Sequence, residues 1–215
     1  MISKEIKVAH SFRRQNFHES QFNHLKCRLI NFCETHFFES NGKVVLSKDE
    51  KENLSKIFNW VIGYRINVNL NKGLMITGDY GTGKSVLMKA IVKFIDEYYS
   101  DKIVTNGIPS PLYVISHDIS NAYIEQNITL LNKMKTTSVL AIDDLGYEPK
   151  KVVSFGTEQH PFEEIMMYRY DRRRTILITT NLSLKQIGEL YGEHVKDRLK
   201  QMVYIIEFKG ESKRK

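Results

Sequence analysis

The chain contains little cysteine, no long apolar segment and no export signal. These absences argue against a secreted, disulfide-rich protein and against a membrane-spanning one. Two of its 215 residues are cysteine, and residues 1–20 are polar and basic without the apolar region of a signal peptide. No apolar run approaches the roughly 20 residues that a helix needs to span a bilayer. We therefore expect a protein of a reducing, cytoplasmic setting with no membrane partner.

Acidic residues are outnumbered as well. Lysine and arginine total 32 against 25 aspartate and glutamate, which makes the formal net charge +7. This balance favours a polyanionic partner, for which nucleic acid is the usual candidate. From charge alone, a generally basic surface without a specific partner is an equal alternative. The apolar and charged fractions, 41% and 27%, are ordinary for a globular protein and predict a real core.

The most informative stretch is residues 78–85, which read G-D-Y-G-T-G-K-S and match the phosphate-binding loop G-x-x-x-x-G-K-[ST]. An apolar run at 73–77 precedes it and apolar residues at helical spacing follow it, so the loop should join a buried strand to a helix N-terminus, which attracts anions. Lys84 should reach the β- and γ-phosphates of ATP, and the Ser85 hydroxyl should bind Mg²⁺. The expected nucleotide-binding residues are Gly78, Asp79, Tyr80, Gly81, Thr82, Gly83, Lys84, Ser85 and Val86.

A second acidic element follows about sixty residues later. The apolar run 139–142 ends in Asp143 and Asp144, and ligands of parallel sheets bind at the carboxyl ends of the strands. Asp143 should contact the metal through its water shell, and Asp144 should polarise the attacking water. The alternative is that two acids cap a strand in solvent.

Two further residues are candidates for catalysis. Asn181 follows an apolar strand at 175–180 and could orient the lytic water against the γ-phosphate, although an asparagine there is often only a turn residue. Arg198 could enter a neighbouring subunit's site and stabilise charge on the transferring phosphoryl group. From spacing alone, a surface helix carrying Lys196, Asp197 and Lys200 is the simpler interpretation of Arg198.

The order of elements predicts an α/β fold with a parallel five-stranded sheet flanked by helices, because strands alternate with helices along the chain. The expected strands are 73–77, 112–115, 139–142, 175–179 and 203–208. The expected helices start at Ser47, in a capping box with Glu50, and at Ser85; others cover 116–133, 162–170, the residues from Ser183, and 195–201. A loop should connect Asp144 to the helix at 162. We divide the chain into a helical N-terminal extension, 1–45, and an ATPase domain, 46–215.

Within the extension, His24, Cys27, Cys33 and His36 form the pattern H-x₂-C-x₅-C-x₂-H, and these residue types bind zinc. On a continuous helix the two pairs point about 120° to 240° apart and cannot share one ion. No glycine or proline between residues 28 and 32 would break the helix. Cysteines in the apolar stripe of a helix are therefore the preferred interpretation.

Taken together, the motifs resemble the DnaC/IstB family of AAA+ ATPases, the bacterial helicase loaders and transposition helpers. The matching segments lie between about residues 50 and 209 and are Gly73-Leu74, 78–85, 140–148, Arg169-Tyr170, Thr175 to Asn181, Tyr191-Gly192 and Asp197-Arg198-Leu199. The resemblance implies that Asn181 is the sensor-1 residue and Arg198 the arginine finger. It also implies ATP with Mg²⁺, a homo-oligomer in the ATP state, and assembly on single-stranded DNA with a replicative helicase or a transposase.

The chain departs from this family in two places. Asp144 stands where many AAA+ proteins carry glutamate, so hydrolysis should be slow or its water differently placed. The sequence ends soon after Phe208, which leaves no room for a full lid domain with its sensor-2 arginine.

The sequence also allows several DNA contacts and three alternative functions. DNA could bind Arg172-Arg173-Arg174 or Lys150-Lys151, with Tyr147 or Tyr168 stacking on bases, although solvated charge and ordinary packing explain each cluster alone. The alternatives to a helicase loader are a transposition helper of the same fold, a nucleotide-binding regulator with little turnover, and a small-molecule kinase. A kinase would normally carry a mobile arginine-bearing lid, for which the sequence shows no candidate.

Overall fold

A computed structural model describes residues 23–24, 27–31, 47–62, 72–105, 111–154, 156–209 and 212. Residues 23–24 and 27–31 are helical. The other helices are α3 (Lys48–Val61), α4 (Lys84–Thr105), α5 (Ser116–Ile124), α6 (Ile128–Thr136), α7 (Pro161–Asp171), α8 (Leu184–Tyr191) and α9 (Glu193–Met202). The strands are β1 (Gly73–Gly78), β2 (Leu112–Ile115), β3 (Val139–Leu145), β4 (Val152–Ser154), β5 (Thr157–Gln159), β6 (Thr175–Thr180) and β7 (Val203–Phe208).

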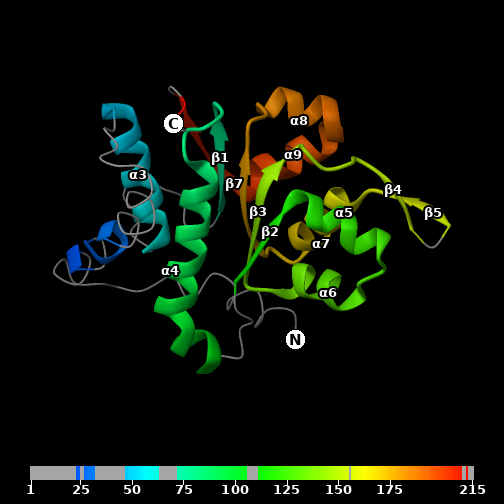
Figure 1. Ribbon diagram of the computed structural model, residues 1–215, viewed down its shortest axis with the longest axis horizontal. Coiled ribbons are helices and arrows are strands. Elements are labelled where there is room, and N and C mark those ends of the chain that lie inside the picture. The colour runs from blue at the N-terminus through cyan, green and yellow to red at the C-terminus, as the bar shows by residue number, and fades with distance from the viewer. Residues whose placement is uncertain are drawn as a thin grey trace.

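Five of these strands form a parallel sheet in the order β2-β3-β6-β1-β7, which confirms the predicted α/β architecture. In Figure 1 the sheet is seen nearly edge-on, with α3 and α4 on one side and α5 to α9 on the other. All five strands run in the same direction, so their carboxyl ends lie together at one edge, toward the top of Figure 1.

The strands are apolar on both faces because helices cover both faces. On β1, Leu74 and Ile76 belong to the hydrophobic cluster under α3 and α4, whereas Met75 belongs to the cluster under α5 to α9. All three side chains are fully buried. This alternation follows from the two-residue repeat of a strand, and it explains why the sequence shows continuous apolar runs.

The N-terminal side of the domain begins with the predicted capping box. The Ser47 side chain accepts a hydrogen bond from the Glu50 backbone N–H at 3.2 Å, and the Glu50 carboxylate accepts one from the Ser47 N–H at 2.8 Å. The helix that follows, α3, buries Ile57 and Trp60 in the cluster it shares with α4. Leu29, from the predicted N-terminal helix, is fully buried in the same cluster.

Two predicted elements differ from the structure. The helix expected at 116–133 is divided into α5 and α6, because Gln126 adopts a left-handed φ of 55° and the side chain of Asn127 then accepts from the Leu130 N–H to start α6. The stretch expected to be a loop after Asp144 contains the antiparallel hairpin of β4 and β5, which projects from the body of the molecule in Figure 1. The helix after the glycine loop, which the apolar spacing predicts over 85–99, runs to Thr105.

The described residues include part of the possible zinc site and two positions beyond the last strand. Of the four possible zinc ligands, His24 and Cys27 are described and both are exposed, whereas the positions at 33 and 36 lie outside the described residues. The described residues contain no group of three or more histidine, cysteine or carboxylate side chains that could hold a metal ion. None of the helices in the described ranges is long and apolar enough to cross a membrane. Beyond β7, the described positions Lys209 and Ser212 are not helical.

Candidate nucleotide site

The glycine loop lies between β1 and α4, as the sequence predicts. Gly78, Gly81 and Gly83 have φ values of 126°, 74° and 90°, which side chains with a Cβ rarely adopt. A Cβ on Gly78 would lie 1.9 Å from the carbonyl oxygen of Phe208, and one on Gly81 would collide with the side chain of Ser212. The backbone can follow this path only with glycine, and it leads directly into the N-terminus of a 22-residue helix.

Lys84 is folded into this loop. Its side chain is buried, and its Nζ donates to the carbonyl oxygens of Gly78 at 3.0 Å and Asp79 at 2.5 Å. The hydroxyl of Thr82 lies 3.4 Å from the same Nζ and donates to Asp79 O at 2.9 Å. Neutral oxygens therefore hold the ammonium group at the N-terminus of α4. A bound phosphate would supply the negative charge that these partners lack.

Asp143 is held by two strands adjacent to its own. Its Oδ2 accepts from the hydroxyl of Tyr113 on β2 at 2.6 Å, and its Oδ1 accepts from the hydroxyl of Thr179 on β6. Asp143 is buried. Burial and the hydrogen bond to Asp143 raise the pKa of Tyr113, so the phenol remains a donor. This pairing orients the carboxylate, and neither Tyr113 nor Thr179 was recognised from the sequence.

Asp144 follows at an irregularity in the strand. The register of β3 with β6 shifts between Ile142 and Leu145, and Asp144 has a left-handed φ of 54°. Its backbone N–H donates to the Thr179 hydroxyl at 2.9 Å, and its carbonyl oxygen accepts from the Ser116 hydroxyl at 2.8 Å. Because this bulge adds a residue to the strand, Asp144 is half-buried where Asp143 is buried.

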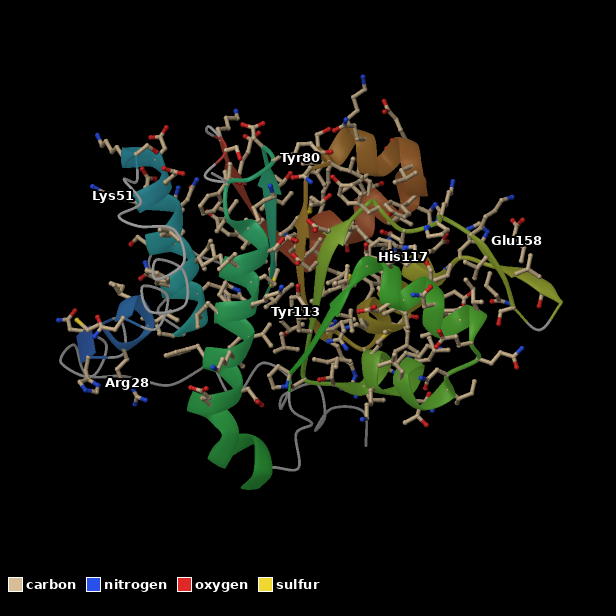
Figure 2. The ribbon with its side chains drawn as sticks, viewed as in Figure 1. Arg28, Lys51, Tyr80, Tyr113, His117 and Glu158 are labelled. Carbon is tan, nitrogen blue, oxygen red and sulfur yellow. The ribbon has the colours of Figure 1, made fainter. Side chains whose placement is uncertain are left out.

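A hydrogen bond joins the segments that follow β3 and β6, beside the glycine loop. Asn181 donates from Nδ2 to the Tyr147 hydroxyl at 3.2 Å. The neighbouring Tyr80 side chain is the main cause of the raised pKa of Tyr147. Tyr80 is exposed at the carboxyl end of β1, as Figure 2 shows. The structure thus brings together three motifs that are separated in the sequence.

The remaining predicted nucleotide-site residues lie on the loop and the first turn of α4. Ser85 is half-buried in that turn, and Val86 is exposed beside it. The oxygens of Ser85 and Asp143 are of the type that Mg²⁺ prefers. Asn181 Oδ1 is buried and has no hydrogen-bond partner within the described structure. Glycine backbone, a buried lysine, oxygen donors and an unsatisfied amide oxygen fit a triphosphate with its magnesium.

Arg198 is the predicted residue that lies apart from this group. It is on α9, and its guanidinium carbon is 4.8 Å from the centroid of the Tyr170 ring. Within the described structure, the Nε of Arg198 is buried without a hydrogen-bond partner. A role in the site of the same subunit therefore has no contact to support it.

A buried carboxylate joins the loop after β3 to the helices that lead to Arg198. Glu148 is buried and accepts from the Gly146 N–H at 2.9 Å and from the hydroxyl of Tyr191. Burial and the charge of Glu148 raise the pKa of Tyr191. Tyr191 ends α8, and its ring lies 4.9 Å from that of Phe162 on α7. The loop that carries Tyr147 is therefore attached to the α8–α9 junction.

The strand order, the glycine loop after β1 and the acids near the carboxyl end of β3 define the class of fold as a P-loop NTPase of the AAA+ type. The same edge of the sheet carries the glycine loop, Asp143, Asp144 and Asn181. No protein-family model matches the chain, and no curated protein matches its sequence.

Several solved structures share this fold. The crystal structure of the DnaC helicase loader has a TM-score of 0.59 and 23% identity, over 84% of this chain and 98% of that one. The crystal structure of DnaI has a TM-score of 0.58 and 20% identity, over 80% and 88%. AMPPCP-bound DnaA from Aquifex aeolicus has a TM-score of 0.50 and 18% identity, over 76% and 48%. These likenesses confirm, at the level of the fold, the resemblance that the motifs indicate.

Proposed function

We propose that the chain is an ATPase of the helicase-loader type, which binds ATP and assembles in that state on single-stranded DNA and a partner helicase. The observation that carries the nucleotide site is the glycine loop between β1 and α4, in which the carbonyl oxygens of Gly78 and Asp79 hold the buried Lys84. The fold shared with the DnaC loader and with DnaI supports the loading role. A similar fold in a DnaA bound to AMPPCP and single-stranded DNA supports both ligands.

The loop binds the triphosphate through its backbone N–H groups and the N-terminus of α4. Lys84 exchanges its carbonyl partners for the β- and γ-phosphates. Ser85, and Asp143 through the metal's water shell, would hold Mg²⁺, which when bound neutralises charge on the phosphate oxygens. Tyr113 and Thr179 keep the carboxylate of Asp143 in the required orientation.

Hydrolysis depends on Asp144, at the bulge of β3, and on Asn181, which follows β6. Asp144 accepts a hydrogen bond from the attacking water and polarises it, and Asn181 orients that water against the γ-phosphate. The aspartate side chain is one methylene shorter than the glutamate many AAA+ proteins use, so turnover by the isolated subunit should be slow.

Arg198 acts on a neighbouring subunit. Arg198 is half-buried, and its guanidinium lies over the ring of Tyr170 in its own chain. In an oligomer it would reach the γ-phosphate of the adjacent protomer and stabilise the transferring phosphoryl group. Hydrolysis should therefore depend on assembly.

The nucleotide site is tested by ATP binding and turnover in Lys84→Ala, with Lys93→Ala as the control. Lys93 is an exposed lysine on the same helix, where it pairs with Glu97 at 3.9 Å. Lys84→Ala should lose binding of a fluorescent ATP analogue and lose turnover, whereas Lys93→Ala should match the wild type. Normal ATP binding by Lys84→Ala would refute the site.

The role of Arg198 is tested separately. Arg198→Ala should bind ATP normally and should lose only the part of its turnover that rises with protein concentration or single-stranded DNA. If Arg198→Ala hydrolyses ATP like the wild type when assembled, the residue does not act on a neighbour. A wild type that binds ATP but shows no turnover under any condition would favour the regulatory module.

The partner is tested by affinity capture from the native cell with Asp144→Asn, which should bind ATP and remain in the assembled state. Recovery of a ring helicase would support loading. Recovery of a transposase would instead favour the transposition-helper alternative.

A further inference from the structure

Positively charged side chains are concentrated near the amino ends of β3 and β6. Five cations come from the last turn of α6 and from the turn between α7 and β6, and we name them the basic surface: Lys133, Lys135, Arg172, Arg173 and Arg174. Asp171 is the acidic residue of the same turn. Among the described residues, none of the ion pairs involves any of the five cations.

Contacts hold the two segments of the basic surface together. Arg174 donates from Nη1 to the Thr136 carbonyl oxygen at 2.5 Å. The Arg172 guanidinium lies 3.7 Å from the centroid of the Tyr168 ring, and the Lys135 ammonium lies 5.6 Å from the same centroid. One aromatic ring thus binds a cation from each segment. The cluster is built on packed helices and not on isolated surface side chains.

A buried arginine adds charge beneath this surface. Arg169 is completely buried and donates to the carbonyl oxygens of Met134 at 2.8 Å and Thr137 at 3.2 Å. Burial lowers the pKa of Arg169, and the nearby Arg174 lowers it further. The guanidinium of Arg169 therefore adds a positive charge beneath the cations of the basic surface.

The basic surface is remote from the nucleotide site. It lies where β3 and β6 begin, whereas Asp143 and Asn181 lie where these strands end. A six-residue strand spans about 20 Å, so a triphosphate at the glycine loop does not reach the five cations. In Figure 1, α6 lies toward the end of the molecule opposite the carboxyl ends of the strands.

We propose that the basic surface binds single-stranded nucleic acid, with the cations contacting phosphates and the stacked pair of Arg172 and Tyr168 contacting a base. Arginine and lysine are the side chains that neutralise a phosphate backbone. A guanidinium that already stacks on tyrosine presents its outer plane to a base, and such stacking occurs with the unpaired bases of single strands. The proposal deepens the proposed function by locating its nucleic-acid contact, and it does not depend on the nucleotide site.

The test measures fluorescence anisotropy of a labelled oligothymidylate with the full chain, without nucleotide and at several salt concentrations. The surface variant is Lys135→Gln, Arg172→Gln, Arg173→Gln. The matched control removes the same charge at exposed lysines on other helices, in the triple variant Lys51→Gln, Lys93→Gln, Lys185→Gln. We expect the surface variant to lose at least about tenfold in affinity and the slope of log K against log salt to fall by about 2, since each lost contact in single strands removes about 0.7. The control should change less than about twofold.

Four results would overturn the proposal: no binding by the wild type at low salt, equal losses in the two triple variants, tighter binding of duplex than of single strand by the wild type, or equal wild-type binding of an abasic oligomer of the same length. If the triple variant does not fold, the double variant of the exposed pair Arg172→Gln and Arg173→Gln replaces it. Lys84→Ala separates this proposal from the nucleotide site, because its nucleotide-free affinity for the oligonucleotide should equal that of the wild type.

Discussion

The hydroxyl of Tyr113 on β2 donates to Oδ2 of Asp143 on the neighbouring parallel strand β3 at 2.6 Å, although Tyr113 is paired in the sheet with Ala141, two residues before Asp143. Thr179 donates to the other carboxylate oxygen from the strand on the opposite side. The acid proposed to hold magnesium is therefore oriented by side chains from both adjacent strands, and a carboxylate held in this way is pre-organised for a metal.

Replacing Tyr113 by phenylalanine should weaken magnesium binding without unfolding the domain. The ring is kept while the hydrogen bond that orients Asp143 is lost, so the Mg²⁺ concentration for half-maximal ATP binding or turnover should rise about tenfold. A Mg²⁺ titration with a fluorescent ATP analogue measures this. The control is Tyr123→Phe. It removes a 2.9 Å hydrogen bond to Glu164, which lies away from the site. Equal Mg²⁺ requirements for the two variants would contradict the role of Tyr113.

Replacing Tyr147 by phenylalanine should increase affinity for ATP. In the structure the Asn181 amide donates to the Tyr147 hydroxyl at 3.2 Å, and that bond must break before the amide can serve a bound nucleotide. A neutral hydrogen bond contributes about 1 kcal/mol net, which corresponds to about a fivefold lower Kd. Titration calorimetry of ATP binding measures the change, and a weaker affinity in Tyr147→Phe would show that the hydroxyl assists binding instead.

Replacing Arg169 by alanine should destabilise the fold strongly. Its guanidinium donates to four backbone carbonyls at the end of α6 and the start of β6, from Met134, Lys135, Thr137 and Thr175. Leaving these groups buried and unpaired should lower the free energy of unfolding by about 3 kcal/mol or more. Urea denaturation measures this. Arg172→Ala, which removes an exposed guanidinium one turn away, should cost less than about 1 kcal/mol; a similar cost in both variants would contradict the structural role.

Glu148 and Tyr191 should be energetically coupled. The tyrosine hydroxyl donates to the buried carboxylate, so Glu148→Gln and Tyr191→Phe each remove the same charge-assisted bond. Their double-mutant cycle in urea denaturation should give a coupling of about 1–2 kcal/mol. The pair Glu148→Gln with Tyr113→Phe provides the control cycle, since Tyr113 bonds to Asp143 instead of Glu148. Additive effects of Glu148→Gln and Tyr191→Phe would mean that the bond does not attach the loop to α8.

Much of the site could be predicted from the sequence, because each of its motifs consists of residues that are adjacent in the chain. The loop at 78–85 is eight consecutive residues whose glycines and lysine act through their own backbone and the adjacent helix. Asp143 and Asp144 were recognised because they directly follow an apolar strand. The continuous apolar runs also predicted the five parallel strands, since strands covered on both faces are apolar at every position.

Other features required the tertiary structure because they depend on residues distant in sequence. Tyr113 and Thr179 lie 30 and 36 residues from the carboxylate that they orient. The hairpin of β4 and β5 was expected to be loop because its strands have only three residues each, too few for a periodic pattern. The break between α5 and α6 depends on one left-handed residue, Gln126, which no proline or glycine marks.

The sequence by itself determined the class of fold and the chemistry of the phosphate loop, because apolar periodicity and a contiguous motif act over short distances. Only the tertiary structure decided which side chains support Asp143, that Tyr147 bonds to Asn181, and that the cations of α6 and of the α7–β6 turn form one surface. Those relationships arise when strands and helices far apart in the chain pack side by side, and no pattern within one segment encodes them.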